Sequence, residues 1–244
     1  MYCTADICGD FATQLFKIAA LFYVKKKYNK HIILQNQNDF MLKSQLFINI
    51  PYDIKTFTFV TKLENIDILP TDSNIFLDID FKTFNYFDND ILESMRFFVY
   101  SDENFMSIAY DRYSKIKQNF NCEDDDIVSV YIDDCANYNY YNKAIHYIEK
   151  KNVVIFISDP EINLSFIEKA DYNFHIIYEN NIIIQFILLS FFQFNIINYT
   201  SPIYSMWAMY ISKYKDVKKC ILPSHIKQLV NYIDFNNIQY KFIT

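Results

Sequence analysis

Polar side chains capable of chemistry follow two apolar runs in the second half of the sequence. Asp133 and Asp134 come directly after the run 127–132, and Ser158 and Asp159 come directly after a second run. Two carboxylates at the end of a strand could hold Mg²⁺ or Mn²⁺ against the diphosphate of a nucleotide. The pattern is common, and a solvated acidic loop is the interpretation that the sequence alone favours.

Another candidate site lies near the start of the chain, at the only glycine among 244 residues. Leu15, Ile18 and Phe22 recur at helical spacing, so we expect a helix to begin shortly after Gly9. Glycine gives the backbone freedom for a tight turn, and the N-terminus of a helix attracts a phosphate or another anion. An ordinary corner between a strand and a helix is the plainer interpretation, and the sequence favours it.

Two further patterns point away from chemistry. Asp78 and Asp80 resemble the strand-end pair of haloacid-dehalogenase phosphatases, but the Phe-Lys-Thr that follows contains no glycine and the rest of that pattern is absent. His146 falls within an expected helix and His175 within an expected strand. These positions favour a structural role for both histidines over a catalytic one.

Strands and helices alternate in the second half, and this alternation would position the polar residues. Apolar strands are expected at 127–132, 153–157, 174–177 and 195–198, with helices at 140–151, 161–168 and 182–194. Such a pattern indicates a parallel sheet covered by helices on both faces. Ligands bind beyond the carboxyl ends of these strands, which singles out Asp133, Ser158 and the loop after Asn198. Asp159 is expected to cap the helix at 161–168, with Pro160 opening it.

The first half shows weaker patterns of the same kind. A β-α-β start is expected, with strands at 31–34, 57–60 and 74–81, a strand or short helix at 96–100 and a helix at 107–118. The whole chain therefore belongs to the α/β class. We divide it into two halves, 1–120 and 121–244.

Composition limits the cellular compartments and the partners that can be expected. The formal net charge of −6 argues against a nucleic-acid partner, because binding to phosphates needs clustered Lys and Arg. Five cysteines without a C-x-x-C pair fit a reducing compartment and no structural zinc. The most apolar stretch, 182–197, contains Gln185 and Gln193 and is too short to cross a bilayer. With no visible signal peptide, we expect a cytoplasmic protein without an integral membrane segment.

The stretch around Gly9 is similar to the signature of a known enzyme family. Residues 9–17, Gly-Asp-Phe-Ala-Thr-Gln-Leu-Phe-Lys, resemble the Gly-x-x-Gly-Asn-Gln-Leu-Phe-Gln stretch near the start of the α-1,2-fucosyltransferases. The first glycine and the Gln-Leu-Phe match in place. Ala12 stands where the family has its second glycine, and Thr13 where it has asparagine.

A second stretch, 127–145, is similar to the core motif of that family. There a strand enters His-x-Arg-Arg-Gly-Asp-Tyr, and a helix with Tyr-Tyr-x-x-Ala-Ile follows. The strand, the loop, the tyrosine pair and the Ala-Ile fall in the same order here. Five loop positions differ: Tyr131 replaces the histidine, Asp133 and Asp134 the two arginines, Cys135 the glycine and Ala136 the aspartate.

Two later stretches continue the resemblance in the same order. Residues 153–159 resemble the Phe-Phe-Val-Phe-Ser-Asp-Asp of the family, with the serine and the first aspartate matched. Residues 185–212 resemble an Asp-Leu-x-Leu-Met-Ser helix followed by Ile-Ala-Asn-Ser-Ser-Phe-Ser-Trp-Trp-Gly-Ala. Trp207, the only tryptophan, falls on the second of the two family tryptophans. Residues 35–126 have no matching stretch.

The resemblance implies a glycosyltransferase built from two facing Rossmann-like halves, a GT-B-like form of the α/β fold. Residues 1–120 would form the acceptor side, and 121–244 would bind the donor nucleotide. The implied reaction is inverting transfer of fucose from GDP-fucose to a hydroxyl of a glycan acceptor, without a metal or other cofactor. The donor-binding residues that it implies are Gly9, Gln14, Tyr131, Asp133, Ser158, Asp159, Ser201 and Ser205, and it implies no catalytic residue.

The substitution at Asp133 opens an alternative function. In the family an arginine grips the diphosphate at this place, because the fork of a guanidinium suits a phosphate. A carboxylate there replaces attraction by repulsion. Lys143, Arg112 or Lys213 could supply a cation from elsewhere. The alternative is a catalytically inactive relative that keeps the fold in order to bind a glycan or a protein.

Overall fold

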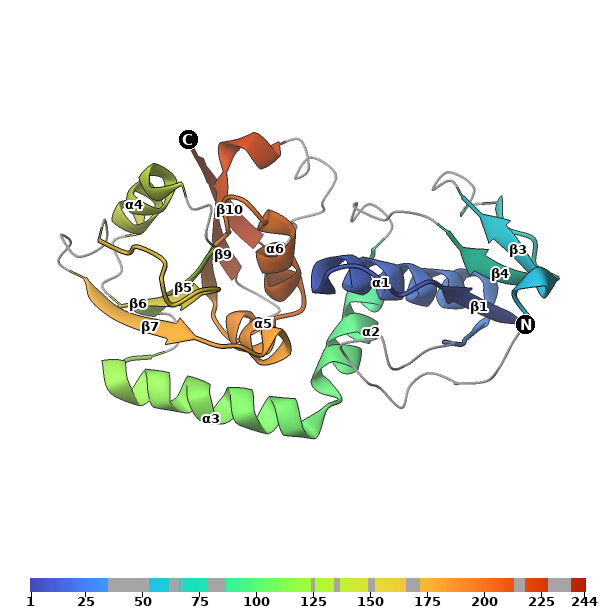
Figure 1. Cartoon of the computed structure of the whole chain (residues 1–244), viewed down its shortest axis with the longest axis horizontal. Coiled ribbons are helices and arrows are strands. Elements are labelled where there is room, and N and C mark those ends of the chain that lie inside the picture. The colour runs from blue at the N-terminus through green and yellow to red at the C-terminus, as the bar shows by residue number, and fades with distance from the viewer. Residues whose placement is uncertain are drawn as a thin grey trace. The chain divides into compact units, whose positions relative to one another are not determined.

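The computed structural model shows two compact units, Met1–Asp102 and Glu103–Thr244, each with its own parallel sheet (Figure 1). It describes residues 1–34, 53–61, 66, 68–78, 87–123, 126–133, 137–148, 152–165, 172–212, 218–227 and 238–244. Helices accompany both sheets, so the α/β class with two parallel sheets is confirmed. The acceptor and donor roles expected of the two halves stay predictions.

The first unit contains a four-stranded sheet with the order β2-β1-β4-β3. Its strands and α-helices are β1 (Tyr2–Ala5), α1 (Phe11–Tyr28), β2 (His31–Ile32), β3 (Phe57–Val60), β4 (Asn74–Leu77) and α2 (Asn89–Tyr100). The chain enters through β1, crosses over by α1 and returns in parallel as β2, so the expected β-α-β start is confirmed. The run 96–100, which the sequence left open between strand and helix, lies within α2.

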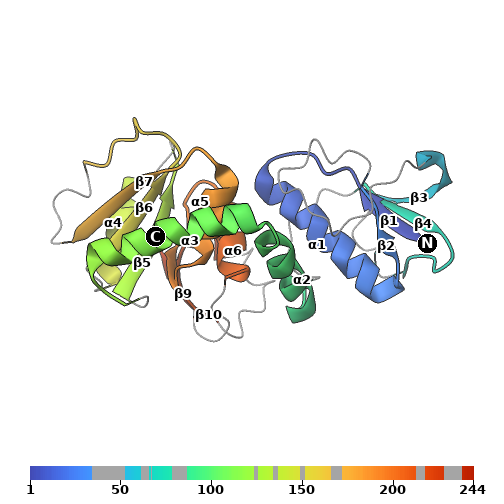
Figure 2. The same ribbon diagram turned by 90° about the horizontal axis from the view of Figure 1, so that it is seen from below.

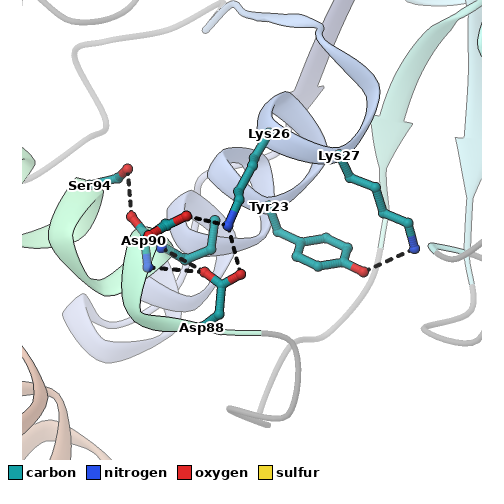
Figure 3. A network of polar contacts seen from close by, with 7 residues as sticks. Tyr23, Lys26, Lys27, Asp88, Asp90 and Ser94 are labelled. Atoms are coloured by element: carbon teal, nitrogen blue, oxygen red, sulfur yellow. Dashed lines mark hydrogen bonds and ion pairs between the residues drawn. The ribbon is translucent and has the colours of Figure 1, made fainter.

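A polar contact joins α1 to the start of α2, within the first unit (Figure 3). Lys26 Nζ lies 2.8 Å from Asp88 Oδ2 and 2.6 Å from Asp90 Oδ2. Hydrogen bonds to Asp88 and Asp90 raise the pKa of Lys26 above its ordinary value. Asp88 also caps α2, since its side chain accepts from the backbone N–H of Asp90 and Ile91. All three charged side chains are largely exposed, so this contact orients the helices more than it stabilises them.

The second unit contains a six-stranded sheet with the order β10-β9-β8-β5-β6-β7. Its strands and α-helices are α3 (Glu103–Phe120), β5 (Ile127–Ile132), α4 (Tyr138–Tyr147), β6 (Asn152–Ile157), β7 (Asn173–Tyr178), α5 (Ile182–Ser190), β8 (Phe194–Ile196), α6 (Pro202–Tyr210), β9 (Lys218–Pro223) and β10 (Ile238–Ile243). The first strand of this unit, β5, lies in the middle of the sheet beside the fourth, β8. This is the doubly wound order 3-2-1-4-5-6, which reverses direction between β5 and β8.

Alternate side chains of β5 serve the two faces of this sheet. Val128, Val130 and Ile132 pack into an apolar cluster with Tyr140 and Ala144 of α4. These residues are all buried, so α4 covers this face closely. Burial of apolar surface at about 25 cal/mol per Å² is the main contribution that holds such a layer together.

The opposite face of β5 is covered by α6, α5 and α3. The ring of Tyr131 lies 5.1 Å from the ring of Tyr204 in α6, and Ser129 Oγ accepts a hydrogen bond of 2.6 Å from Asn195. In turn, α6 packs against α5, and α5 packs against α3 (Figures 1 and 2). Helices therefore cover both faces, as the apolar strands predicted.

The helix expected at 161–168 is absent from the part of this range that the structure describes. Within 161–168, the described residues 161–165 are not helical, and the remaining three lie outside the described residues. Asp159 was expected to cap that helix; instead, its Oδ1 accepts from the backbone N–H of Glu161 at 2.8 Å and closes a turn. An aspartate followed by proline begins a turn as readily as a helix, because both need the same local hydrogen bond.

No helix among the described residues is long and apolar enough to cross a membrane. The most apolar helix, α5, has nine residues, and the chain then turns into β8. The cytoplasmic location stays a prediction.

Candidate functional site

The candidate site lies at the carboxyl edge of the second sheet, where its order reverses. β5 and β8 are neighbours, with Val130 opposite Ile196 in the parallel register. The chain leaves β5 toward α4 and leaves β8 toward α6, and these helices cover opposite faces of the sheet. The loops after the two strands therefore diverge, and such a divergence forms a crevice for a ligand in open α/β sheets. Asp133 and Asn198 stand in those two loops.

Asn198 connects the end of β5 to the start of α6. Its Nδ2 donates to the carbonyl oxygen of Tyr131 at 3.0 Å, and its Oδ1 accepts from the backbone N–H of Ser201. Its own backbone N–H donates to Ser205 Oγ at 3.4 Å. Asn198 is fully buried, so its side of these hydrogen bonds is shielded from water. The order of expected strands pointed to the loop after Asn198, but no sequence pattern placed the side chain of Asn198 in the site.

The N-terminus of α6 has no side-chain cap. Ser201 occupies the N-cap position with its side chain exposed, and that side chain makes no capping hydrogen bond. Pro202 opens the helix, and the first turn contains no acidic residue. The first turn of a helix leaves backbone N–H groups without helical partners, and the helix dipole makes this end positive. The start of α6 is therefore suited to an anion.

Asp133 is a buried carboxylate with an unpartnered oxygen. The residue is only 8% exposed, and its Oδ1 has no hydrogen-bond partner among the described residues. Nor does the carboxylate form an ion pair with any of those residues. Burying a charged or polar atom without a partner costs free energy, so such atoms are rare in folded proteins. Asp134, Cys135 and Ala136, the next three positions of the motif, lie outside the described residues.

Two buried tyrosines of this region have raised pKa values. Burial raises the pKa of Tyr141, and the nearby carboxylate of Asp133 raises it further. The hydroxyl of Tyr141 accepts from the backbone N–H of Tyr199 at 3.0 Å and lies 3.4 Å from the carbonyl oxygen of Tyr131. Burial also raises the pKa of Tyr204, whose hydroxyl hydrogen bonds to Ile182 O at 3.0 Å. These hydroxyls stay protonated at neutral pH.

Ser158 and Asp159 reach the same edge from the neighbouring strand β6. The backbone N–H of Ser158 donates to Ile132 O at 3.3 Å, so the end of β6 lies against the residue before Asp133. Both side chains are exposed, which leaves them accessible to a ligand. Ser205 differs, because it is buried and its hydroxyl contacts the backbone of Asn198. The structure thus brings six residues of the second unit to one edge: Tyr131, Asp133, Ser158, Asp159, Ser201 and Ser205.

Gly9 and Gln14 form a separate arrangement in the first unit. Gly9 has φ +99°, which a residue with a side chain rarely adopts, and its carbonyl oxygen accepts from Gln14 Nε2 at 3.1 Å. Asp10 caps α1 by accepting from Thr13 N at 2.7 Å. The turn follows β1, an inner strand between β2 and β4, so it lies at the carboxyl edge of the first sheet. The sequence predicted both the turn and the helix after it.

The cations suggested as replacements for arginine have other contacts where they are described. Lys143 Nζ donates to Thr244 O at 2.9 Å, and Arg112 forms an ion pair with Glu179. Lys213 lies outside the described residues. Among the described residues, no group of three or more His, Cys, Asp or Glu side chains could hold a metal ion. A complete protein-only metal centre is therefore not found in the described part of the chain.

Sequence reasoning missed two residues that organise this edge. Asn198 ends an apolar strand, a position that is typical of side chains at the carboxyl edge, and this signal was available. The hydroxyl of Tyr204 donates to Ile182 O at the start of α5 and its ring packs on Tyr131, but nothing in the sequence marks this residue. Its role depends on the packing of α6 against the sheet.

Comparison with known proteins finds similarity in fold but not in sequence. No family model and no curated protein matches the sequence. Among solved structures, the fucosyltransferase NodZ from Bradyrhizobium aligns with a TM-score of 0.54 and 10% identity, over 86% of this chain and 92% of that one. A mutant of Arabidopsis thaliana FUT1 in complex with GDP aligns with a TM-score of 0.52 and 8% identity, over 86% of this chain and 68% of that one. At such identities the likeness concerns the fold, and the fold of this chain is fucosyltransferase-like, as the collinear motifs predicted.

Proposed function

We propose that this chain is a divergent fucosyltransferase-like protein that binds GDP-fucose at the carboxyl edge of the second sheet and transfers fucose to a hydroxyl of a glycan. The proposal rests on the fold and on the site together, because folds of this type serve many functions. An α-1,2 linkage follows only from the resemblance of the motifs. The observation that carries the proposal is the uncapped N-terminus of α6 at the reversal of the strand order.

In this proposal the diphosphate lies at the first turn of α6. Its oxygens accept from the backbone N–H groups that have no helical partner, and the helix dipole favours its charge. Asn198 holds the turn in place through Ser201. The arrangement favours the departing diphosphate of a transfer reaction, since preorganised donors stabilise charge as it develops.

The exposed side chains at the end of β6 complete the donor site in this proposal. Ser158 and Asp159 offer a hydroxyl and a carboxylate, which hydrogen bond to the hydroxyls and ring edges of a nucleoside. Gly9 and Gln14 lie in the first unit, which takes the acceptor side in this proposal, and their expected contact with the donor stays a prediction. A catalytic base is not assigned, and the partners are a sugar nucleotide and a glycan, without nucleic acid.

The proposal is tested by calorimetric titration of the whole chain with GDP and with GDP-fucose. We expect dissociation constants in the micromolar range. A chain that gives no heat at millimolar nucleotide, with and without Mg²⁺, has no donor site, and the proposal then fails.

A charged cap on α6 gives a sharper version of this experiment. Ser201→Asp places a carboxylate at the empty N-cap, where it accepts from the helix N–H groups and competes with an anionic ligand. We expect this variant to unfold at a higher temperature and to bind GDP more weakly. Asn181→Asp, at the already capped start of α5, is the matched control and should leave GDP affinity unchanged. Equal loss in both variants would contradict a site on α6.

A second candidate function is favoured by Asp133. The Asp133 carboxylate has no cationic partner among the described residues and would oppose a bare diphosphate, so a catalytically inactive relative that binds a glycan or a protein also fits the site. Carboxylates and tyrosines together are suited to the hydroxyls and apolar faces of sugars. Binding of free oligosaccharides by a chain that ignores GDP would support this second function over the first.

A further inference from the structure

The geometry points to a divalent cation that enters the site with the diphosphate and is ligated by Asp133. This inference rests on the proposed function, because the ligand that brings the cation is a nucleoside diphosphate. It goes beyond that function by making binding metal-dependent. It also departs from the sequence-based expectation, which included no metal.

Asp133 supplies the first observation. Its carboxylate is more than nine-tenths buried, and its Oδ1 has no hydrogen-bond partner among the described residues. The polar groups around it are already engaged: the amide of Asn198 with Tyr131 and Ser201, and the hydroxyl of Tyr141 with Tyr199. Among the described residues this buried carboxylate has no positive partner, and a bound cation would supply one.

The N-terminus of α6 supplies the second, independent observation. It has no side-chain cap and no acidic residue in its first turn, so it favours an anion. Asn198 links this helix start to Tyr131, two residues before Asp133, through a single buried side chain. The loop after β5 therefore contains a group that favours a cation, Asp133, and the loop after the neighbouring strand β8 leads into a helix start that favours an anion.

A diphosphate alone satisfies only one of these two preferences. Its oxygens would gain from the start of α6, but their charge would repel the carboxylate of Asp133. A complex of the diphosphate with a divalent cation satisfies both, since the phosphates face the helix and the metal faces the carboxylate.

Mg²⁺ and Mn²⁺ have the coordination chemistry that this arrangement needs. Mg²⁺ is commonly bound by one or two carboxylates plus the phosphates of a substrate, and it keeps several waters. Such a site requires no cage of protein ligands. This agrees with the described residues, which contain no group of three acidic, histidine or cysteine side chains around one point.

The experiment compares GDP binding to the whole chain with millimolar Mg²⁺ and with EDTA. We expect Mg²⁺ to tighten binding by at least about tenfold, because it offsets the repulsion between the diphosphate and the carboxylate of Asp133. In Asp133→Asn the effect of Mg²⁺ should largely disappear, and GDP in EDTA should bind more tightly than to the parent. Asp126→Asn is the matched control, since Asp126 precedes the same strand at the opposite edge of the sheet.

The outcomes separate this inference from the proposed function. Equal GDP affinity with Mg²⁺ and with EDTA overturns the metal site but leaves the nucleotide site standing. An equal benefit of Mg²⁺ in the parent and in Asp133→Asn also overturns it, because the cation then acts on the nucleotide alone. No binding in either condition refutes the proposed function, and the metal site with it.

A direct measurement on the parent keeps the inference testable if Asp133→Asn does not fold. Electron paramagnetic resonance detects free Mn²⁺ in solution, so the amount bound can be followed without a variant. We expect the protein to retain Mn²⁺ with GDP present beyond the amount that GDP alone retains, and to retain little without GDP. Retention equal to that of GDP alone contradicts a protein ligand.

Discussion

Asn198 Nδ2 donates to the carbonyl oxygen of Tyr131 at 3.0 Å, across the gap between β8 and β5. This hydrogen bond joins the two central strands just beyond the last pair of their register, Val130 and Ile196. Because Asn198 Oδ1 also accepts from Ser201 N, one side chain fixes both the strand ends and the start of α6. The edge that we propose as the donor site depends on this residue.

Replacing Asn198 by alanine should lower both stability and nucleotide affinity. The variant loses two part-buried hydrogen bonds and leaves Tyr131 O and Ser201 N with fewer partners. We expect the free energy of unfolding to fall by roughly 2–4 kcal/mol, as measured by urea denaturation. Asn180→Ala, at an exposed position, should change it by less than about 0.5 kcal/mol. If Asn198→Ala loses less than about 0.5 kcal/mol of stability and binds GDP normally, Asn198 does not organise the donor site.

Tyr140 should contribute to stability through its hydroxyl rather than through its ring alone. The hydroxyl lies 2.9 Å from Ile197 O and 3.1 Å from Ile221 O, within the buried core of the second unit. Tyr140→Phe keeps the ring and removes these contacts, so we expect a loss of about 1–2 kcal/mol in urea denaturation. Tyr147→Phe, on the exposed side of the same helix, is the control and should be near neutral. If both variants lose the same free energy of unfolding, the two buried contacts of the Tyr140 hydroxyl add nothing to stability.

Gly9→Ala should destabilise the first unit because of backbone conformation. At φ +99° a side chain is strained, and the added Cβ would approach Thr13 Cγ2 to 3.1 Å. We expect a loss of about 1–2 kcal/mol in thermal or urea unfolding. Thr13→Ser removes Cγ2, so a comparison in that background separates the two causes. If the loss vanishes there, the collision and not the backbone conformation accounts for it.

Alkaline pH should unfold the protein through its buried acids. Burial raises the pKa of Tyr140, Tyr141 and Tyr204 above 10.0, and that of Cys3 from 9.0 to about 12. The unfolded chain therefore loses these protons at lower pH than the folded one. Their contribution to stability is complete below about pH 9 and falls as pH rises, by up to about 1.4 kcal/mol per pH unit for each group.

Urea midpoints measured from pH 8 to pH 11 check this dependence, with tyrosine ionisation followed by ultraviolet absorbance. Tyr140→Phe should show a shallower decline of stability above pH 10 than the parent, since one buried acid is gone. A midpoint that stays constant to pH 11 would contradict burial of these groups.

The sequence predicted best where the chemistry of a segment is local. The strand at 127–132 has the same bounds in the structure, and the strand at 153–157 differs from β6 by one residue. Both are apolar runs with polar neighbours, so their ends are marked. The strands β9 and β10 were not predicted, and β10 alternates apolar with polar residues along a half-exposed edge of the sheet.

The site was predictable only in part. The strand ends at Ile132 and Ile157 pointed to Asp133 and to Ser158, and the parallel sheet brings these ends together. The order of strands is not written in a local pattern, however, so the sequence could not show that β8 returns to lie beside β5. Without that neighbour, the hydrogen bonds of Asn198 and the position of α6 relative to Asp133 could not be inferred. The part that these residues take in binding stays a prediction.

The order of the six strands in the sheet also affects how the second unit folds while the chain is being synthesised. β6 and β7 can pair beside β5 as soon as they leave the ribosome, but the other edge of β5 waits for β8, about sixty residues after the end of β5. Until then the apolar strand Ile127–Ile132 presents an open row of backbone N–H and C=O groups, which invites pairing with another chain. A nascent chain stalled before Phe194 is therefore prone to aggregation, and chaperones that shield strand edges are of most use at this stage.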